Sequence, residues 1–241
     1  MLGTRPDLAY IVRKLSQFSS NPGAEHVLAL FRAVAYIRKH TSLCLKYQRV
    51  NHGNAIDPSG YTDSDWAGDL EDSKSTAGYV FLLGEAAFSW YCKKQGHVSS
   101  STADAEYTAL FRGGEQAFWL RQFYDQIELP LSHPITIYCD NQAAIAMAKN
   151  QGTHSKTKAT RIELHAVRDR ITRREIEVEY VESKKNIADI FTKGLPRETF
   201  ELHRDSLGFE HVTNVLSSLS VEDDVDTSFS TQFDDAPSFL L

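Results

Sequence analysis

The sequence predicts an α/β fold in which helices flank a five-stranded mixed sheet and a helical hairpin precedes it. Three strand-like segments follow one another between residues 60 and 94, at the close spacing typical of an antiparallel meander. From residue 101 onward helical and strand-like periodicities alternate, so two more strands join the sheet with helices between them. The expected order is therefore β-β-β-α-β-α-α-β-α.

The first 50 residues predict the helical hairpin as a separate unit, residues 1 to 50. Residues 5 to 18 place apolar side chains at helical spacing, Asn-Pro-Gly at 21 to 23 ends that helix, and a second amphipathic helix follows. The apolar stripe is too small for a core of its own, so we expect the hairpin to dock on another part of the protein. Residues 51 to 59 are polar and read as a linker.

The longest helical pattern runs from residue 101 to 127. Its start matches a capping box, in which Ser101 caps the helix and Asp104 reaches back to the Ser101 amide. Glu106 lies one turn further, on the face of small and apolar residues that is expected against the sheet. A buried carboxylate is costly unless a cation meets it; a glutamate that extends to solvent at the helix end is the competing interpretation.

Asp140 follows an apolar strand, residues 135 to 139, and precedes an apolar helix. A carboxylate at a strand end is held still by the backbone on both sides, which favours chemistry. The same position is also typical of an ordinary helix N-cap. Asp140 by itself leaves both interpretations open.

The C-terminal part contains the clearest strand and a short helix. Residues 175 to 181 alternate strictly between apolar and acidic side chains, which predicts a half-buried strand. Asp189 begins a short helix that ends at Gly194 and Pro196. We expect the fold unit to cover residues 60 to 209 and residues 210 to 241, rich in Ser, Asp and Thr, to form a disordered acidic tail.

The composition excludes several classes of protein. No apolar run in the 241 residues approaches the ~18 to 20 needed to cross a bilayer, and the N-terminus lacks the order of a signal peptide. The three cysteines are not paired as CxxC, which argues against a disulfide framework or zinc site and favours a reducing intracellular location, cytoplasmic or nuclear. We expect no membrane partner and no small-molecule cofactor.

The net charge of −6 conceals clusters of basic residues. Residues 221 to 241 hold six acids and no base, and the rest of the chain has 26 acids against 26 bases. Residues 1 to 50 hold eight Lys and Arg against two acids, and residues 156 to 174 hold seven against two. Such clusters suit a polyanion, although a solvated helix face explains them equally well.

Four carboxylates lie on neighbouring elements of the predicted fold: Asp63, Glu106, Asp140 and Asp189. If the fourth strand lies beside the first, Asp63 and Asp140 are neighbours. Clustered carboxylates repel one another unless a hard divalent cation holds them, and oxygen ligands favour Mg²⁺ or Mn²⁺. Two such ions are a standard device for phosphodiester hydrolysis.

The chain resembles the ribonuclease H domain of copia-type LTR retrotransposon Pol polyproteins. The matching segments, in family order over residues 60 to about 209, are YTDSDWAGD, STAGYVFLLG, FSWYCKKQ, SSSTADAEYTAL, FWLRQ, IYCDNQAAIAMAKN, HSKTK, IELHAVRD, VEYV and ADIFTKGLP. The hairpin segment TRPDLAYIVRKLSQFSSNPGAEH is similar to the segment that links the reverse transcriptase to this domain. The resemblance implies a ribonuclease H-like fold and, as partners, an RNA–DNA hybrid and other parts of a reverse transcriptase polyprotein.

The resemblance also implies a catalytic site. The family's catalytic carboxylates, which bind two Mg²⁺ or Mn²⁺ ions, correspond to Asp63, Glu106, Asp140 and Asp189. The implied reaction is cleavage of the RNA strand of an RNA–DNA hybrid, which leaves a 3′ hydroxyl and a 5′ phosphate. The polymerase's own aspartates are absent from these residues, so we expect no DNA synthesis.

The sequence departs from the family at two further points. Lys158-Ala159-Thr160 replaces the usual lysine-histidine-isoleucine, and the loop Glu182 to Ala188 has none of the histidine that many ribonucleases H place there to assist product release. The missing histidine implies slow turnover. The truncated start, the Ala159-Thr160 departure and the unmatched tail leave a catalytically decayed, nucleic-acid-binding remnant as the alternative. A nuclease of the integrase or transposase type on the same fold is disfavoured by the meander and by the inner-helix glutamate.

Several polar side chains are candidates for substrate binding. Hydroxyls at a helix N-terminus can hold a phosphate, and side-chain amides can recognise a 2′ hydroxyl; lysines and histidines line a nucleic-acid backbone. The candidates are Ser101, Thr102, Asn141, Gln142, Lys93, Lys94, His154 and Lys156, with a solvated surface as the competing interpretation of the lysines. We expect Trp66, Trp90 and Trp119 in the core.

Overall fold

The structure, a computed structural model, describes residues 3–47, 57–69, 71–150 and 158–214; the side chains of residues 158–162 and 164 lie outside that description. The helices are η1 (Pro6–Leu8), α1 (Ala9–Ser16), α2 (Ala24–Lys39), α3 (Thr102–Gln126), α4 (Gln142–Lys149), α5 (Lys158–Thr172), η2 (Ser183–Lys185), η3 (Ile187–Phe191) and α6 (Arg197–Asp205). The strands are β1 (Leu43–Leu45), β2 (Ser59–Asp65), β3 (Thr76–Leu83), β4 (Ala86–Lys94), β5 (Ile135–Cys139), β6 (Ile176–Tyr180) and β7 (Phe209–His211). Within these residues, no helix has the length and apolar character that crossing a membrane requires.

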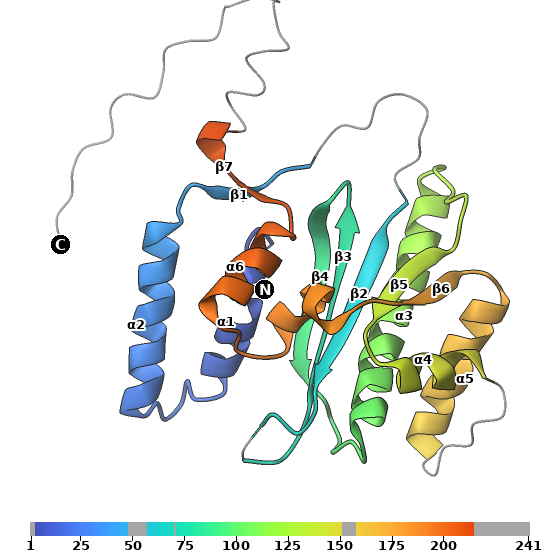
Figure 1. Cartoon of the computed structure of the whole chain (residues 1–241), viewed down its shortest axis with the longest axis horizontal. Coiled ribbons are helices and arrows are strands. Elements are labelled where there is room, and N and C mark those ends of the chain that lie inside the picture. The colour runs from blue at the N-terminus through green and yellow to red at the C-terminus, as the bar shows by residue number, and fades with distance from the viewer. Residues whose placement is uncertain (1–2, 48–56, 70, 151–157, 215–241) are drawn as a thin grey trace, which may run out of the picture.

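The central sheet has the predicted mixed topology. Its strand order is β4-β3-β2-β5-β6, with β2, β3 and β4 antiparallel and with β5 parallel to both β2 and β6 (Figure 1). The first three strands are joined by short connections, which permit antiparallel pairing, whereas the crossover through α3 returns the chain parallel to β2. The predicted five-stranded mixed sheet is confirmed.

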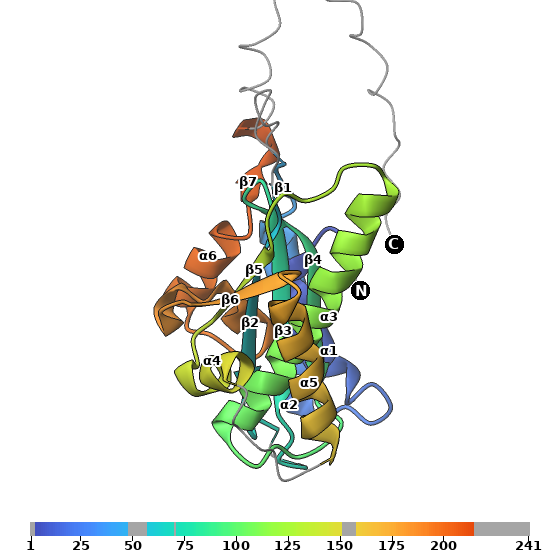
Figure 2. The same ribbon diagram turned by 90° about the vertical axis from the view of Figure 1, so that its right-hand side faces the viewer.

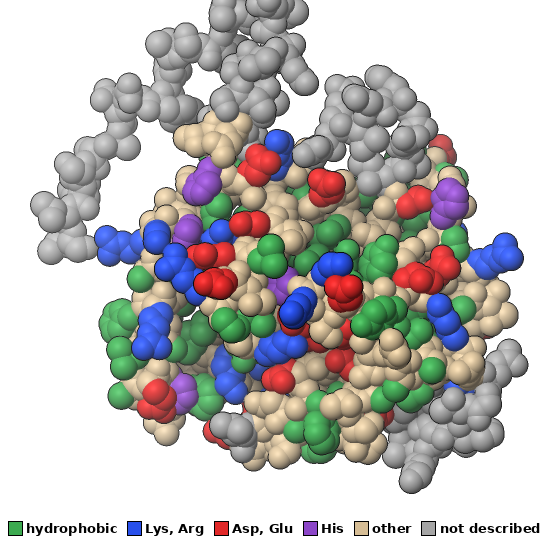
Figure 3. All heavy atoms as spheres, viewed as in Figure 1, with side chains coloured by type: hydrophobic (Ala, Val, Ile, Leu, Met, Phe, Trp, Pro, Cys, Tyr) green, Lys and Arg blue, Asp and Glu red, His purple; other side chains and the backbone are tan. Residues whose placement is uncertain are grey.

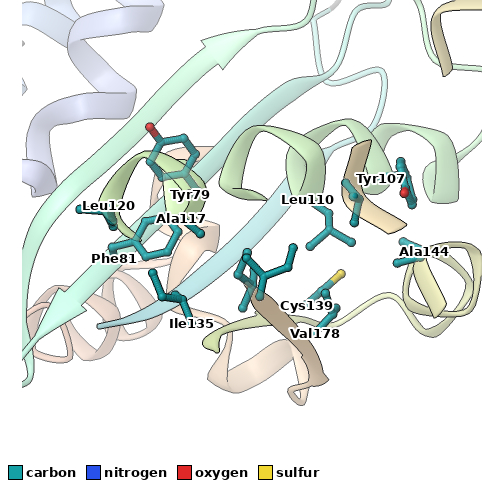
Figure 4. Close-up of a cluster of buried hydrophobic side chains, with 14 of the residues drawn as sticks. Tyr79, Phe81, Tyr107, Leu110, Ala117, Leu120, Ile135, Cys139, Ala144 and Val178 are labelled. Atoms are coloured by element: carbon teal, nitrogen blue, oxygen red, sulfur yellow. The ribbon is translucent and has the colours of Figure 1, made fainter. Parts of the chain in front are cut away.

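Two hydrophobic clusters cover the two faces of the sheet. One lies under α3, α4 and α5 and includes Phe81, Leu110 and Ile137 (Figures 2 and 4). The other lies under α1 and η3 and includes Val80, Phe191 and Leu207. Because Val80 and Phe81 are consecutive in β3, their side chains point to opposite faces and divide between the two clusters.

The register of the parallel pair positions two carboxylates. Thr62 of β2 lies opposite Cys139 of β5. The following residues, Asp63 and Asp140, therefore lie side by side where the pairing ends. A register shifted by one residue would turn Asp63 to the other face of the sheet.

The N-terminal hairpin packs directly on the sheet domain. Arg13 of α1 donates a hydrogen bond of 3.1 Å to Thr76 of β3, and Ala9 belongs to the second hydrophobic cluster. Strand β1 pairs antiparallel with β7, with Cys44 opposite Glu210. Residues 210 and 211, which the sequence analysis assigned to the acidic tail, complete a strand whose partner is far away in sequence. Residues 215–241 lie outside the described residues.

Large apolar side chains remain on the surface at two places. Helix α2 has no buried residue, and hydrophobic side chains gather over it (Figure 3). Trp66 and Trp119 are 47% and 53% exposed, so the prediction that they lie in the core was wrong. The Trp66 indole N–H donates to the Ser99 carbonyl at 3.1 Å, and Trp119 stacks on Phe123, one turn further along α3. Local contacts, rather than burial, hold both rings.

Substitution of Gly78 by Ala is expected to destabilise the fold by about 1–3 kcal/mol. Gly78 lies opposite Asp63, and a Cβ there would lie 2.8 Å from both Phe191 Cβ and Thr192 Cγ2. The added methyl group would push η3 away from β3. Urea unfolding measures the loss, with Gly96→Ala as control because a Cβ at Gly96 meets nothing within 4 Å; equal stability of the two variants would contradict this close packing.

Candidate active site

The structure brings the four predicted carboxylates together from four elements. Asp63 is on β2, Glu106 on the first turns of α3, Asp140 directly after β5 and Asp189 in η3. Ligand atoms of Asp63, Asp140 and Asp189 lie within 4.8 Å of one another, and those of Glu106, Cys139 and Asp140 form a second such group. Asp140 belongs to both groups, so it is the centre of the cluster.

Asp140 does not cap the helix that follows it. The N-cap of α4 is Asn141, whose Oδ1 accepts a hydrogen bond of 3.0 Å from the Ala144 amide. The carboxylate of Asp140 is therefore left to the cluster. Asn141 was predicted to bind substrate, but its side-chain oxygen already accepts the hydrogen bond of the cap.

Two residues that the sequence analysis did not single out hold Asp63 in place. Lys193 Nζ lies 2.9 Å from Asp189 Oδ1 and 3.7 Å from Asp63 Oδ2, so one ammonium group bridges two carboxylates. The hydroxyl of Thr192 donates to Asp63 Oδ2. Thr192 and Lys193 follow directly after η3. The only signal for them in the sequence was that Asp63 and Asp189 need a positively charged partner.

Asn186 connects η3 to β2. Its side chain is fully buried; Nδ2 donates to the Thr62 carbonyl at 2.9 Å, and Oδ1 accepts from the Ala188 amide at 3.2 Å. The first bond reaches the residue before Asp63, and the second caps the helix that carries Asp189. Asn186 thereby connects the strand of Asp63 to the helix of Asp189.

Burial and mutual repulsion raise the pKa values of three of the carboxyl groups. Burial, then the negative charge of Asp189, raises the pKa of Asp63 to about 7. Burial, then Asp63 and Asp140, raises the pKa of Glu106 well above its usual value. Burial also raises the pKa of Asp189, although Lys193 opposes this. For Lys193, burial lowers the pKa, but the neighbouring carboxylates outweigh it and raise the net value.

The protein without a divalent ion is expected to lose stability as the pH rises toward 7. A raised carboxyl pKa means that the protonated form stabilises the fold, so the Asp63 contribution is complete below its ordinary pKa near 4 and is lost as the pH passes about 7. One group contributes about 4 kcal/mol at most. Urea unfolding in EDTA at about pH 5 and pH 8 measures this decrease, and saturating Mg²⁺ should reverse it at the higher pH. Stability that rises over this range in EDTA would contradict the burial of a protonated Asp63.

The predicted substrate-binding residues are scattered around the carboxylates. Ser101 caps α3 by accepting from the Asp104 amide at 3.2 Å, while the Asp104 carboxylate accepts from Ser100 rather than from Ser101 as predicted. Thr102, Gln142 and Lys93 are exposed. His154 and Lys156 lie outside the described residues.

Lys94, also predicted to bind substrate, is held by acidic side chains. Its Nζ lies 2.8 Å from Asp69 and 3.2 Å from Asp72. This charge is therefore already balanced within the protein. Beside it, a hollow of about 450 Å³ is lined partly by Lys93, His97 and Arg112.

Comparison with known proteins identifies the family. The chain is 37% identical over 210 residues to the retrovirus-related Pol polyprotein from transposon TNT 1-94 of Nicotiana tabacum, an alignment that covers 86% of this chain and 15% of that protein. It is 34% identical over 209 residues to the corresponding polyprotein from transposon RE1 of Arabidopsis thaliana, covering 87% and 14%. No family model matches the chain.

A solved structure of LC11-RNase H1 in complex with an RNA/DNA hybrid is 17% identical, with a TM-score of 0.42 over 56% of this chain and 93% of that one. The curated relatives are several times longer than this chain, which spans 15% and 14% of the two polyproteins. The similarity nevertheless extends over most of the present sequence. The chain therefore belongs to the Pol polyproteins of copia-type retrotransposons, of which it represents one segment.

Proposed function

We propose that this chain is a ribonuclease H that hydrolyses the RNA strand of an RNA–DNA hybrid with the help of two divalent cations. The observation that carries the proposal is the convergence of Asp63, Glu106, Asp140 and Asp189 around one shared carboxylate. Membership of the Pol polyprotein family supports it independently. The proposal concerns this segment alone.

The donor set fits hard divalent ions. Glu106 is only 7% exposed, and its buried Oε2 has no hydrogen-bond partner among the residues that the structure describes. Leaving a buried carboxylate oxygen unpaired is costly, and a cation removes that cost. Asp63, Asp140 and Asp189 would hold one Mg²⁺ or Mn²⁺, and Glu106 with Asp140 would hold the second. When bound, such ions activate the attacking water and stabilise the leaving 3′ oxygen.

The protein's own residues prepare the site for this chemistry. Lys193 and Thr192 hold the Asp63 carboxylate, and Asn186 fixes η3 against β2. These contacts keep the ligands close despite their mutual repulsion. Lys193 supplies one positive charge between Asp63 and Asp189 and so balances part of the cluster.

The hybrid would bind across the surface next to the carboxylates. Lys93, His97 and Arg112 line a hollow beside the N-terminal part of α3 and would contact backbone phosphates. Gln142 is exposed at the start of α4, two residues after Asp140, and would contact a sugar hydroxyl. Lys94 contributes less, because Asp69 and Asp72 hold it.

A hybrid-cleavage assay with the purified chain tests the proposed function. A labelled RNA–DNA hybrid should be cut in Mg²⁺ or Mn²⁺ and remain intact in EDTA, with 3′ hydroxyl and 5′ phosphate ends on the products. The same RNA as a single strand is the control substrate. Salt-dependent binding of the hybrid without cleavage in either ion would identify a decayed, binding-only remnant instead.

We also propose that α2 binds another part of the same polyprotein. Six of its apolar side chains are 38% to 66% exposed: Val27, Leu28, Leu30, Phe31, Val34 and Ile37. A contiguous apolar face of this kind marks an interaction surface. The homologous polyproteins are much longer than the aligned segment, and their remaining parts would offer such a partner in cis.

Binding of this chain to the reverse transcriptase part of the polyprotein, expressed separately, tests that surface. Phe31→Glu should weaken binding at least roughly tenfold, because it places a charge in an apolar interface. Leu129→Glu, at a residue that is 62% exposed outside α2, is the matched control. Equal binding by both variants would contradict the proposal. If Phe31→Glu changed only the self-association of the chain, the apolar face of α2 would instead bind a second copy of it.

A further inference from the structure

Cys139 places a thiol among the carboxylates of the site. A ligand atom of Cys139 lies within 4.8 Å of ligand atoms of both Glu106 and Asp140. Neither the proposed reaction nor the hard-ion set of Asp63, Asp140 and Asp189 uses this sulfur. The site therefore contains a soft donor beside its oxygen donors.

The fold holds this thiol firmly. Cys139 is the last residue of β5, it lies opposite Thr62 of β2, and its side chain is fully buried against Val178 and other apolar residues (Figure 4). Among the residues that the structure describes, its hydrogen bond is a long one, 3.9 Å, to the Asn141 carbonyl. Nothing strong competes for the sulfur among the residues with described side chains.

Glu106 supplies the second, independent observation. Its Oε2 is buried and has no hydrogen-bond partner within the described part of the chain. Its carboxylate belongs to the same group of ligand atoms as the Cys139 thiol. An unpaired buried carboxylate oxygen next to a thiol is a donor pair suited to a cation. Asp140, which is half-buried, adds a third donor. A fourth coordination position would then be open to water.

We propose that Cys139, Glu106 and Asp140 bind a thiophilic divalent cation, Zn²⁺ or Cd²⁺. The metal–sulfur bond forms as the thiol proton leaves to solvent, and the two carboxylates complete a set of one sulfur and two oxygens. In tetrahedral zinc sites, bonds of about 2.0–2.3 Å place ligand atoms roughly 3.3–3.7 Å apart, so a contraction of ~1 Å is enough here. Soft ions prefer thiolate, whereas Mg²⁺ prefers oxygen, so the two kinds of ion bind the site differently.

The consequence for the reaction rests on the proposed function. Glu106 and Asp140 are shared between the soft-ion set and the proposed Mg²⁺ set. A thiophilic ion would occupy both carboxylates and draw them toward Cys139. Zn²⁺ should therefore inhibit cleavage in competition with Mg²⁺.

Titration of the chain with Co²⁺ tests the binding site without reference to activity. A cobalt–thiolate bond gives a charge-transfer absorption in the near ultraviolet, which carboxylate ligands do not give. The test uses the Cys44→Ser/Cys92→Ser background, because these two thiols are free and lie outside the cluster. The band should appear in this background, weaken in Glu106→Gln and vanish in Cys139→Ser.

A band that persists in Cys139→Ser, or that never appears in the background protein, would overturn the proposal. If Cys139→Ser does not fold, as judged by circular dichroism, Cys139→Ala gives the same comparison. In a second arm, the Zn²⁺ concentration that halves Mg²⁺-supported cleavage, relative to each variant's own rate, should rise at least roughly tenfold in Cys139→Ser; an unchanged concentration contradicts the competition. Absence of hybrid cleavage by every variant would refute the ribonuclease function but leave the cobalt result to decide the soft-metal site.

Discussion

Replacement of Asp140 by Asn is expected to abolish ion-dependent cleavage of an RNA–DNA hybrid, with a rate loss of at least about a thousandfold, or ~4 kcal/mol of transition-state stabilisation. Asp140 is the carboxylate common to both groups of candidate ligands, so its loss affects both proposed ions. Asn has nearly the same shape but no negative charge. Because Asn141, not residue 140, caps α4, the substitution leaves the helix start intact. Single-turnover cleavage at saturating Mg²⁺ measures the effect.

Asp125→Asn is the matched control for this experiment. It makes the same chemical change on the exposed C-terminal part of α3, away from the carboxylate cluster. This variant should cleave at the rate of the unchanged protein. Circular dichroism should show the same fold for the unchanged protein and for both variants. Undiminished cleavage by Asp140→Asn would place the active site elsewhere.

The sequence predicted the parts of the site that local patterns encode. The period-2 strands, the long helix and the carboxylates at their ends are each visible within about ten residues, so the mixed sheet could be deduced from their order. The ambiguity at Asp140 could not be resolved in this way, because Asp140 and Asn141 are both good capping residues. Only the backbone geometry assigns the cap to Asn141.

The contacts that hold the site together were not predictable, since their partners are distant in sequence. Lys193 meets Asp63 across 130 positions of the chain, and β7 pairs with β1 across a longer separation. A lysine or a three-residue strand has no distinctive pattern of its own. The exposed Trp66 shows the same limit, because aromatic character predicts burial, and a single carbonyl at Ser99 instead keeps the ring at the surface.

Asn186 is the supporting residue whose loss should have the largest effect. Its side-chain amide lies fully inside the protein and joins two partners, the Thr62 carbonyl and the Ala188 amide. Through them it connects the strand of Asp63 to the helix of Asp189. Asn186→Ala would leave a carbonyl and an amide buried without partners, which costs about 2–5 kcal/mol in total. Urea unfolding should show this loss of stability both with and without Mg²⁺.

The same variant separates stability from site geometry. If Asn186 fixes the spacing of Asp63 and Asp189, the variant should also bind Mg²⁺ roughly ten- to a hundredfold more weakly when measured well below its unfolding transition. Asn150→Ala, at the exposed end of α4, is the control, because its side chain lies at the surface. Reduced stability with unchanged Mg²⁺ affinity would limit Asn186 to a structural role. A loss of both would show that the buried amide, although it touches no ion, sets the distance across which the carboxylates act.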